Sequence, residues 1–317
     1  MSQPQLDRAD ARVTHATGLS GTVRAFIDRV KAGDLGSLPV VVGLAIIWTV
    51  FTALNPIFLS PNNLVNLLFD CSTTGVIALG IVCVLMLGEI DLSVGSMSGV
   101  GSAIIGVLWV NQGVPLPVAI GTAVALGALI GGAYATLRNR LGMPSFVSTL
   151  SGLLALLGLQ LYMLGATGSI NLPYGSKMVE FGQLLILPTW LSYSLVLIPG
   201  IVMLVVGRST NARRRAANLS AGSSTGLVLK AALTTLVLLA IVFYLSLGRG
   251  VPWMFALFVG LVLVMNYGLT RTQWGRSMKA VGGNAEAARR AGINVRRIYV
   301  SAFMLCSSLA ALGGVLS

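Results

Sequence analysis

The recurrence of long apolar runs constrains this chain more than any other feature. Runs of about 20 apolar residues follow one another from residue 38 to the end. Only 9% of the residues are charged, against about 25% in soluble domains, and the mean hydropathy is +0.87. A helix of about 20 residues crosses the hydrocarbon core of a bilayer and satisfies its own backbone hydrogen bonds. The sequence therefore predicts an all-α protein, a polytopic transmembrane helical bundle.

The alternation of apolar and polar stretches predicts about nine spans. They are placed at about 38–59, 73–88, 95–110, 117–137, 144–164, 184–206, 226–247, 251–269 and from 299 onward. Residues 64–69 are expected to form a separate interfacial helix before the second span. The domain prediction is a polar tail, residues 1–37, followed by one transmembrane domain, residues 38–317.

The charge pattern predicts the orientation of the spans. The net charge of +12 comes from short Lys and Arg clusters that lie between the apolar runs. With the N-terminus in the cytoplasm, the Arg-rich loops at 138–142, 207–225 and 270–298 all fall inside, as the positive-inside rule requires. Clusters at the ends of spans are typical of contact with membrane lipid. We therefore expect no nucleic-acid partner.

The stretch Thr270–Ile298 is the longest polar run after the first span. Asn284 follows two glycines and can act as an N-cap, and Glu286 falls in the first turn, where the helix dipole favours a negative charge. Gly292 fits the position just after a helix end. These signals predict a helix over Ala285–Ala291 of about two turns. A short capped helix between two spans is suited to docking into a partner.

A second polar stretch, Gly88–Ser96, lies between two apolar runs and carries Glu89 and Asp91. Ionisable side chains within membrane segments are costly, and they usually face a partner or a cavity. Interrupted helices occur at membrane depth where they line a cavity or are buried in protein. Glu89, Asp91 and Ser93 are therefore candidates for a translocation path or gate. The alternative is an ordinary cytoplasmic turn, in which Asp91 caps the following helix.

The sequence contains no group of residues typical of an enzyme. It has no Walker A lysine loop, and His15 is its single histidine, so neither a Ser-His pair nor a His/Cys metal set is expected. Cys71, Cys83 and Cys306 lie in or beside apolar runs without paired spacing, which is typical of small buried residues. We expect no catalytic residue, no metal site and no cofactor.

The order Glu286-Ala287-Ala288, three further residues and then Gly292 resembles the EAA loop in the permease subunits of ATP-binding-cassette (ABC) importers. In that family this loop forms a cytoplasmic helix that docks in a cleft of the ATP-binding subunit. The resemblance implies that residues 270–298 are a cytoplasmic coupling loop within a permease domain. The implied coupling residues are Asn284, Glu286, Ala287, Ala288 and Gly292.

Other segments resemble the permeases of the ribose/xylose class of monosaccharide importers. The matching segments are Gly75–Gly95 with Ile90–Ser96 at its core, Pro144–Leu150, Gly275–Ser277, Ala280–Asn284 and Ala291–Val295. Glu89 before Ile-Asp, together with an additional Arg-rich loop and span at about 207–250, makes the chain most similar to the xylose permeases. The family continues with further spans beyond the position of Ser317, which implies that a C-terminal part is missing from this chain.

The resemblance implies a permease subunit that translocates a monosaccharide, xylose or a related sugar, across the bacterial inner membrane. The implied partners are a separate ABC ATPase subunit, a periplasmic sugar-binding protein and a second permease subunit in a homodimer. Such a subunit is not itself an enzyme. Two other hypotheses remain open. One is a secondary transporter that uses Glu89 and Asp91 as a proton or ion relay, and the other is a membrane scaffold that transports nothing.

Overall fold

The computed structural model describes residues 36, 38–217 and 223–317, so the predicted N-terminal tail lies outside the described residues except for Gly36. Every regular element within these ranges is a helix, and a single isolated β-bridge joins Ile186 and Pro252. Eight of the helices are long and apolar enough to cross a membrane, and α2 (Leu38–Leu54) is a shorter apolar helix. The predicted all-α polytopic bundle is confirmed.

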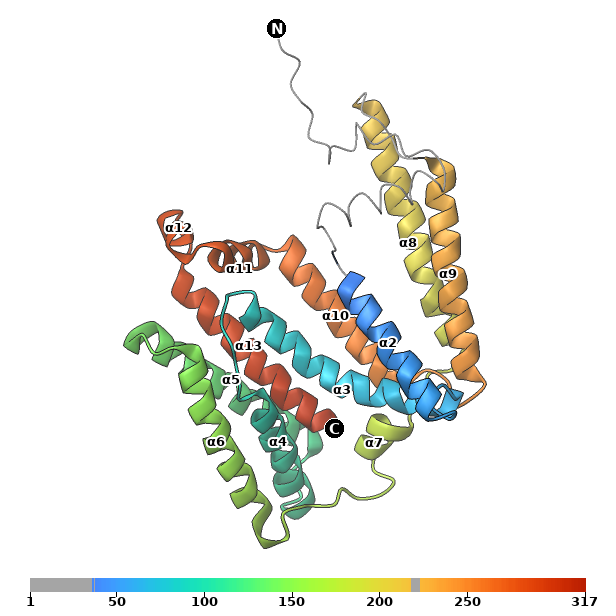
Figure 1. Ribbon diagram of the computed structural model, residues 1–317. Helices are drawn as coiled ribbons and strands as arrows, with labels where there is room; N and C mark the ends of the chain where they lie inside the picture. The colour runs from blue at the N-terminus through green and yellow to red at the C-terminus, as the bar shows by residue number, and fades with distance from the viewer. Residues whose placement is uncertain (1–35, 37, 218–222) are drawn as a thin grey trace. The chain divides into compact units, whose positions relative to one another are not determined.

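The contacts divide the chain into two units, unit 1 (Met1–Val65 and Leu187–Gly250) and unit 2 (Asn66–Ile186 and Val251–Ser317). The helices of unit 1 are α2, α8 (Thr189–Ala216) and α9 (Ser224–Ser246) (Figure 1). Gly200 of α8 lets that helix approach Thr235 of α9. The Tyr244 hydroxyl of α9 donates to the Leu59 carbonyl at 2.8 Å, which ties α9 to the segment after α2.

Unit 2 carries all the residues that the sequence singles out for function. Its elements are α3 (Pro61–Leu85, whose first turn belongs to unit 1), α4 (Val94–Ile104), η1 (Ile105–Asn111), α5 (Leu116–Leu141), α6 (Ser145–Leu164), η2 (Gly165–Thr167), α7 (Lys177–Val179), η3 (Glu180–Leu184), α10 (Trp253–Arg271), α11 (Gln273–Gly283), α12 (Ala285–Arg290) and α13 (Val295–Leu316).

Helix α13 is the centre of unit 2, and 67% of its most apolar 18-residue stretch is buried. Three neighbouring helices bring their backbones against it at glycines. A Cβ added at any of these glycines would meet backbone atoms of α13: Gly80 in α3, Gly101 in α4, and Gly127 and Gly131 in α5. Gly127-x-x-x-Gly131 is a small-xxx-small pattern, which allows two helices in a membrane to approach closely.

Helix α3 corrects the expectation of a separate interfacial helix at residues 64–69. It runs without interruption for 25 residues from Pro61 to Leu85. Its polar middle does not break the helix, because the hydroxyls bond within it: Ser72 donates to the Leu68 carbonyl at 2.5 Å, and Thr73 donates to the Asp70 carbonyl at 2.8 Å. Ser and Thr side chains can satisfy themselves in this way without ending a helix.

Two further differences concern the polar segments. Helix α8 continues through Arg213–Arg215 to Ala216, where a loop from residue 207 was expected. Helix α11 was not predicted. Its Thr272 cap accepts from the Gly275 amide at 3.2 Å, and Met278 and Val281 are buried on one face. The expected loop before α12 is therefore an amphipathic helix with its apolar side against the bundle.

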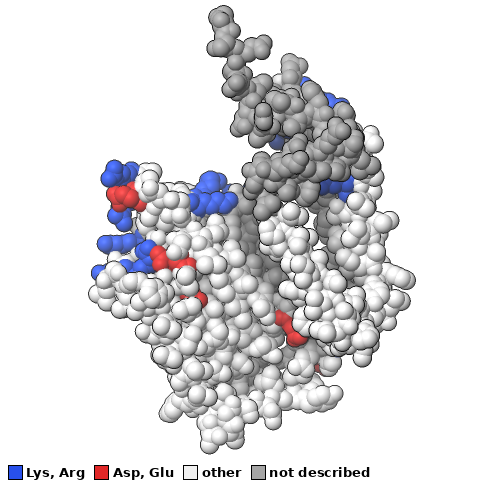
Figure 2. Space-filling model, viewed as in Figure 1, with Lys and Arg blue, Asp and Glu red and all other residues white. Residues whose placement is uncertain are grey.

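Basic side chains gather at the end of unit 2 where α11 and α12 lie, which we call the coupling-loop end. They come from the last turn of α5, from α11 and α12, and from the first turn of α13: Arg138, Arg140, Arg276, Lys279, Arg289, Arg290, Arg296 and Arg297. Figure 2 shows Lys and Arg side chains there, whereas most of the rest of unit 2 on this face carries none. The distribution agrees with the prediction that this end faces the cytoplasm.

The packing around α13 makes a testable prediction for glycines of α5. In Gly131→Ala, the added methyl group collides with the Phe303 carbonyl of α13, so we expect a loss of about 1–3 kcal/mol of stability. Gly121→Ala is the matched control, because nothing lies within 4 Å of its added Cβ. Thermal unfolding of the purified protein in detergent measures both variants. Equal melting temperatures for the two would contradict the packing role of Gly131.

Candidate functional site

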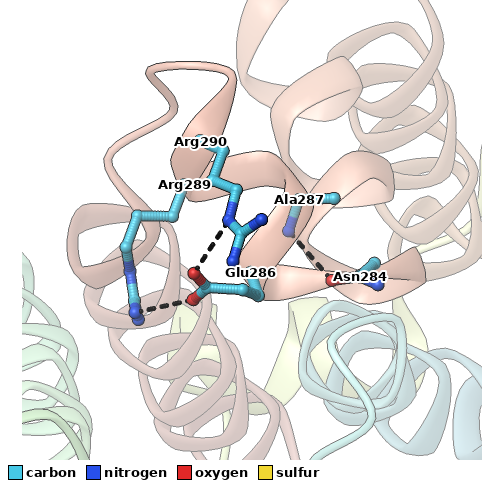
Figure 3. A network of polar contacts seen from close by, with 5 residues as sticks. All are labelled: Asn284, Glu286, Ala287, Arg289 and Arg290. Carbon is cyan, nitrogen blue, oxygen red and sulfur yellow. Dashed lines mark hydrogen bonds and ion pairs between the residues drawn. The ribbon is translucent and has the colours of Figure 1, made fainter.

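Helix α12 has the predicted cap at each end. The Asn284 side chain accepts a hydrogen bond from the Ala287 amide at 2.9 Å, which satisfies a donor that the helix itself leaves free (Figure 3). At the other end Gly292 adopts a φ of 83°, a conformation that side chains other than glycine rarely take. The Ile293 amide then donates to the Ala288 carbonyl at 3.0 Å. The two-turn helix, its N-cap and its glycine end are confirmed.

The outer face of α12 carries a small ion-pair network. Glu286 accepts from Arg289 at 3.0 Å and from Arg290 at 3.3 Å, so both arginines turn back toward one carboxylate (Figure 3). These side chains remain 57%, 66% and 80% exposed, in that order. Exposed pairs at this spacing are worth only about 0.3–0.5 kcal/mol each. A partner can therefore replace them at little cost.

The inner face of α12 is apolar and anchored. Ala288 is buried at 4% exposure, in a cluster with Met278 and Val281 of α11 and Val295 of α13. Ala287, one residue earlier, is exposed. The two neighbouring alanines of the predicted coupling motif thus have different roles, since one holds the helix to the bundle and the other lies on the surface.

The coupling loop rests on the segment between α3 and α4, residues 86–93, which we call the α3–α4 segment. Gly282 at the end of α11 lies so close to Met86 that an added Cβ would collide with the Met86 carbonyl oxygen. Met86 and Leu87 also pack in the cluster that contains Val281. The start of the α3–α4 segment is therefore in direct contact with α11, and a displacement of α11 and α12 would act on it directly.

After a turn at residues 86–88, the α3–α4 segment runs inward beside α13 without regular secondary structure (Figure 1). Asp91 is buried at 7% exposure, next to Tyr134 of α5 and Cys306 of α13. Cys306 comes 11 residues after Val295, where α13 begins, so it lies roughly 16 Å along a helix that rises about 1.5 Å per residue. Asp91 therefore lies near the middle of α13 and not at its end.

Hydrogen bonds hold the inner part of the α3–α4 segment. Asp91 Oδ1 accepts from the Ser93 amide at 2.9 Å and from the Ser93 hydroxyl at 2.7 Å. On the opposite side the Ile90 amide donates to the Ser145 hydroxyl at 3.3 Å, and the Leu92 amide donates to the Thr149 hydroxyl at 3.2 Å. Asp91 Oδ2 is buried and has no hydrogen-bond partner among the described residues.

Glu89 lies closer to the coupling-loop end and has a different partner. Its Oε1 accepts from Arg138 Nε at 2.6 Å, and the Arg138 guanidinium lies 3.4 Å from the centroid of the Tyr299 ring. Glu89 and Asp91 are therefore not arranged as a pair, because each contacts its own set of neighbours.

The structure brings together the two sets of residues that the sequence predicted separately. The set on α12 and the set on the α3–α4 segment meet through α11 and the first turns of α13. Sequence reasoning missed Arg138, Tyr299, Ser145 and Thr149 as partners of this segment. Ser145 and Thr149 did lie in a motif that resembles the family, and Arg138 was noted only as part of a basic cluster. No group of three or more His, Cys, Asp or Glu side chains in the described ranges could hold a metal ion.

Comparison with known proteins identifies the family. A sequence model for the branched-chain amino acid transport system / permease component matches residues 63–317. The chain belongs to this family. With eight helices among the described residues that are long and apolar enough to cross a membrane, it is a multi-pass protein of the bacterial inner membrane. No solved structure matches it.

Individual relatives agree with the family. The xylose transport system permease protein XylH of Escherichia coli (strain K12) is 36% identical over 267 residues, which cover 82% of this chain and 65% of that protein. XylH of Haemophilus influenzae (strain Rd) is 31% identical over 299 residues, or 91% of this chain and 76% of that protein. The ribose import permease protein RbsC of Escherichia coli (strain K12) is 27% identical over 278 residues, or 87% of this chain and 67% of that protein. The chain thus spans only 65% of the length of the first of these relatives.

The cap of α12 can be tested directly. In Asn284→Ala the Ala287 amide loses its acceptor, which costs about 1 kcal/mol of helix stability. We expect amide hydrogen exchange over Ala285–Arg290 to become about fivefold faster, as that free-energy change implies. Asn284→Asp keeps a capping oxygen and is the control. Unchanged exchange in Asn284→Ala would show that the cap does not hold this helix.

Proposed function

We propose that the chain is the membrane-spanning permease subunit of an ABC importer, in which a separate ATPase subunit drives a monosaccharide across the inner membrane. The observation that carries the proposal is α12, a short helix capped at both ends. It presents Glu286 and Ala287 to the surface, while Ala288 anchors it to the bundle. A secondary transporter has no need of such a helix. The relatives in this family are named as transport-system permeases.

The proposed sugar is xylose or a related monosaccharide. Two relatives above 30% identity are named as xylose transport permeases, and the ribose permease is more distant at 27%. Sugar selection is assigned mainly to a periplasmic sugar-binding protein, so no residue of this chain is proposed as a sugar ligand.

We assign the proposed partners to the two opposite ends of the membrane spans. The ATPase subunit would dock on the exposed face of α12, and a periplasmic sugar-binding protein would deliver the sugar at the opposite end. A second permease subunit, most simply a second copy of this chain, would complete the path. The basic residues near the coupling-loop end would contact lipid phosphates and not nucleic acid.

The coupling mechanism begins at α12. Closure of the ATPase would push the exposed face that carries Glu286 and Ala287. Ala288 would pass the movement to Met278 and Val281, with which it shares a buried cluster, and Gly282 would pass it to Met86. The α3–α4 segment would then move Glu89, Asp91 and Ser93, the residues proposed to lie beside the translocation path or gate.

The alternative of a secondary transporter has less support. A proton relay through Glu89 and Asp91 would need the two carboxylates to share a proton path. In the structure Glu89 is neutralised by Arg138, and Asp91 is bonded to Ser93. This alternative also leaves the capped α12 without a role.

The energy source of sugar uptake distinguishes the proposed ABC permease from a secondary transporter. The permease is reconstituted in liposomes with its ATPase subunit and sugar-binding protein, and uptake of radiolabelled xylose is followed. We expect uptake to require internal ATP and to survive a protonophore. Uptake that continues without ATP and collapses with the proton gradient would establish the secondary transporter instead.

A variant of α12 belongs to the same experiment. Ala287→Trp places a bulky ring on the exposed face, so it should block docking of the ATPase and abolish ATP-driven uptake while leaving the bundle folded. Gln112→Trp is the control, since Gln112 is also exposed but follows η1, at the other end of the spans. Binding of the ATPase subunit to the Ala287→Trp permease at the wild-type level would contradict the docking role of α12.

Asp91→Asn tests the proposed path residue. The amide keeps the Oδ1 acceptor for Ser93, so the α3–α4 segment should keep its conformation. We expect the complex to assemble normally and uptake to fall about tenfold, equivalent to about 1.4 kcal/mol in the barrier. Asp70→Asn, an exposed carboxylate in α3, is the control for loss of charge. Wild-type uptake by Asp91→Asn would exclude Asp91 from the path or gate.

A further inference from the structure

One ion pair in unit 2 is better shielded from solvent than the pairs on α12. The side chains of Arg138 and Glu89 are only 27% and 15% exposed, whereas the arginines and the glutamate on α12 are all more than half exposed. Arg138 also covers the Tyr299 ring at 3.4 Å from its centroid. A cation between a carboxylate and an aromatic face, both partly removed from water, is held more firmly than a surface pair.

The three residues come from three different parts of the fold. Glu89 is on the α3–α4 segment, Arg138 is in the last turn of α5, and Tyr299 is in the second turn of α13. Asn139 adds a second tie between the same two helices, since its side-chain amide donates to the Arg296 carbonyl at 3.2 Å. The end of α5 and the start of α13 are therefore joined at two adjacent residues of α5.

The start of α13 is also the end of the coupling loop. Asn294 caps α13 by accepting from the Arg297 amide at 3.1 Å, and it follows Gly292 at the end of α12 by two residues. A shift of α12 must therefore move the first turns of α13, where Tyr299 lies. Arg138 rests on that ring, and Glu89 is bound to Arg138, so the same shift also reaches the α3–α4 segment at Glu89, three residues after Met86.

We propose that Glu89, Arg138 and Tyr299 form a clamp that sets the position of the α3–α4 segment and makes it follow α13. The proposal rests on the proposed function, because it adds a second route by which the coupling loop moves that segment. The three residues are positioning residues, and none of them is proposed to touch the sugar. The segment would follow α13 through the clamp and would stay against α6 through the hydroxyls of Ser145 and Thr149.

The test measures how many xylose molecules enter per ATP hydrolysed, in liposomes that contain the permease, its ATPase subunit and its sugar-binding protein. Arg138→Gln removes the charge from the clamp without altering the exposed face of α12. We expect the ATPase subunit still to bind and the number of xylose molecules per ATP to fall about tenfold, within the usual range of coupling between sites. Arg140→Gln is the control, because Arg140 lies in the last turn of the same helix and is exposed.

Two further variants separate positioning from folding. Arg138→Lys keeps a cation near Glu89 but loses the flat stacking group, so it should recover part of the lost coupling. The double variant Glu89→Gln with Arg138→Gln should lose no more coupling than Arg138→Gln alone, since the two side chains act as one unit. If Arg138→Gln unfolds in detergent, Tyr299→Leu, which leaves the ion pair in place, should still lower the number of xylose molecules per ATP.

The outcomes distinguish the clamp from the proposed function. A wild-type number of xylose molecules per ATP in Arg138→Gln, or an equal loss in Arg140→Gln, would overturn the clamp alone. A double variant that loses clearly more coupling than Arg138→Gln alone would overturn it as well. Wild-type permease that shows no ATP-driven uptake would overturn the proposed function, and the clamp as a coupling device would fall with it.

Discussion

The close approach of helix backbones around α13 is the constraint on which the rest of unit 2 depends. Lipid tails are as apolar as leucine, so helices in a membrane gain little from burying apolar side chains against one another and rely on contact area and close packing. Glycines in α3, α4 and α5 give α13 that contact at the level of the backbone itself. At these glycines no side chain of α3, α4 or α5 separates the helix from the α13 backbone, so the helices cannot slide past one another there by rearranging side chains. Movement at the start of α13 is therefore carried along its length, and the neighbouring helices have to follow.

This rigid centre explains why the polar residues of unit 2 are found where they are. The α3–α4 segment has no helix to satisfy its backbone. The Ser145 and Thr149 hydroxyls of α6 and the segment's own Asp91 carboxylate accept hydrogen bonds from its backbone amides in place of the missing helical bonds. Non-helical backbone is tolerated at such depth only where protein surrounds it. The segment therefore depends on its neighbours for its conformation, and α12 has an anchored inner face that lies within contact of its beginning. The exposed and buried faces of one short helix connect the surface of the protein to a buried carboxylate.

The sequence predicted those features whose causes lie within a few residues. Asn284 and Gly292 cap a helix through atoms two to four positions away, so their roles follow from local chemistry alone. The continuity of α3 was not predicted, because serine and threonine in a polar stretch suggest a break unless their hydroxyls bond the preceding turn, as Ser72 does here. The amphipathic α11 was hidden by its charged residues, which occupy the face opposite Met278 and Val281. The partner of Arg138 could not be found, since Glu89 is 49 residues away and only the tertiary packing of the α3–α4 segment near the end of α5 brings them together.

The double capping of α12 has a consequence for the thermodynamics of association. A helix of six residues would not persist in water on its own, because too few hydrogen bonds offset the entropy of ordering its backbone. Here Asn284, Gly292 and the buried Ala288 have already ordered it in the isolated subunit. A protein that binds its exposed face does not have to meet that entropic cost, so a small contact area can support a specific complex. The affinity can then remain low enough for the partner to rearrange its contacts in each cycle, while the helix keeps its conformation.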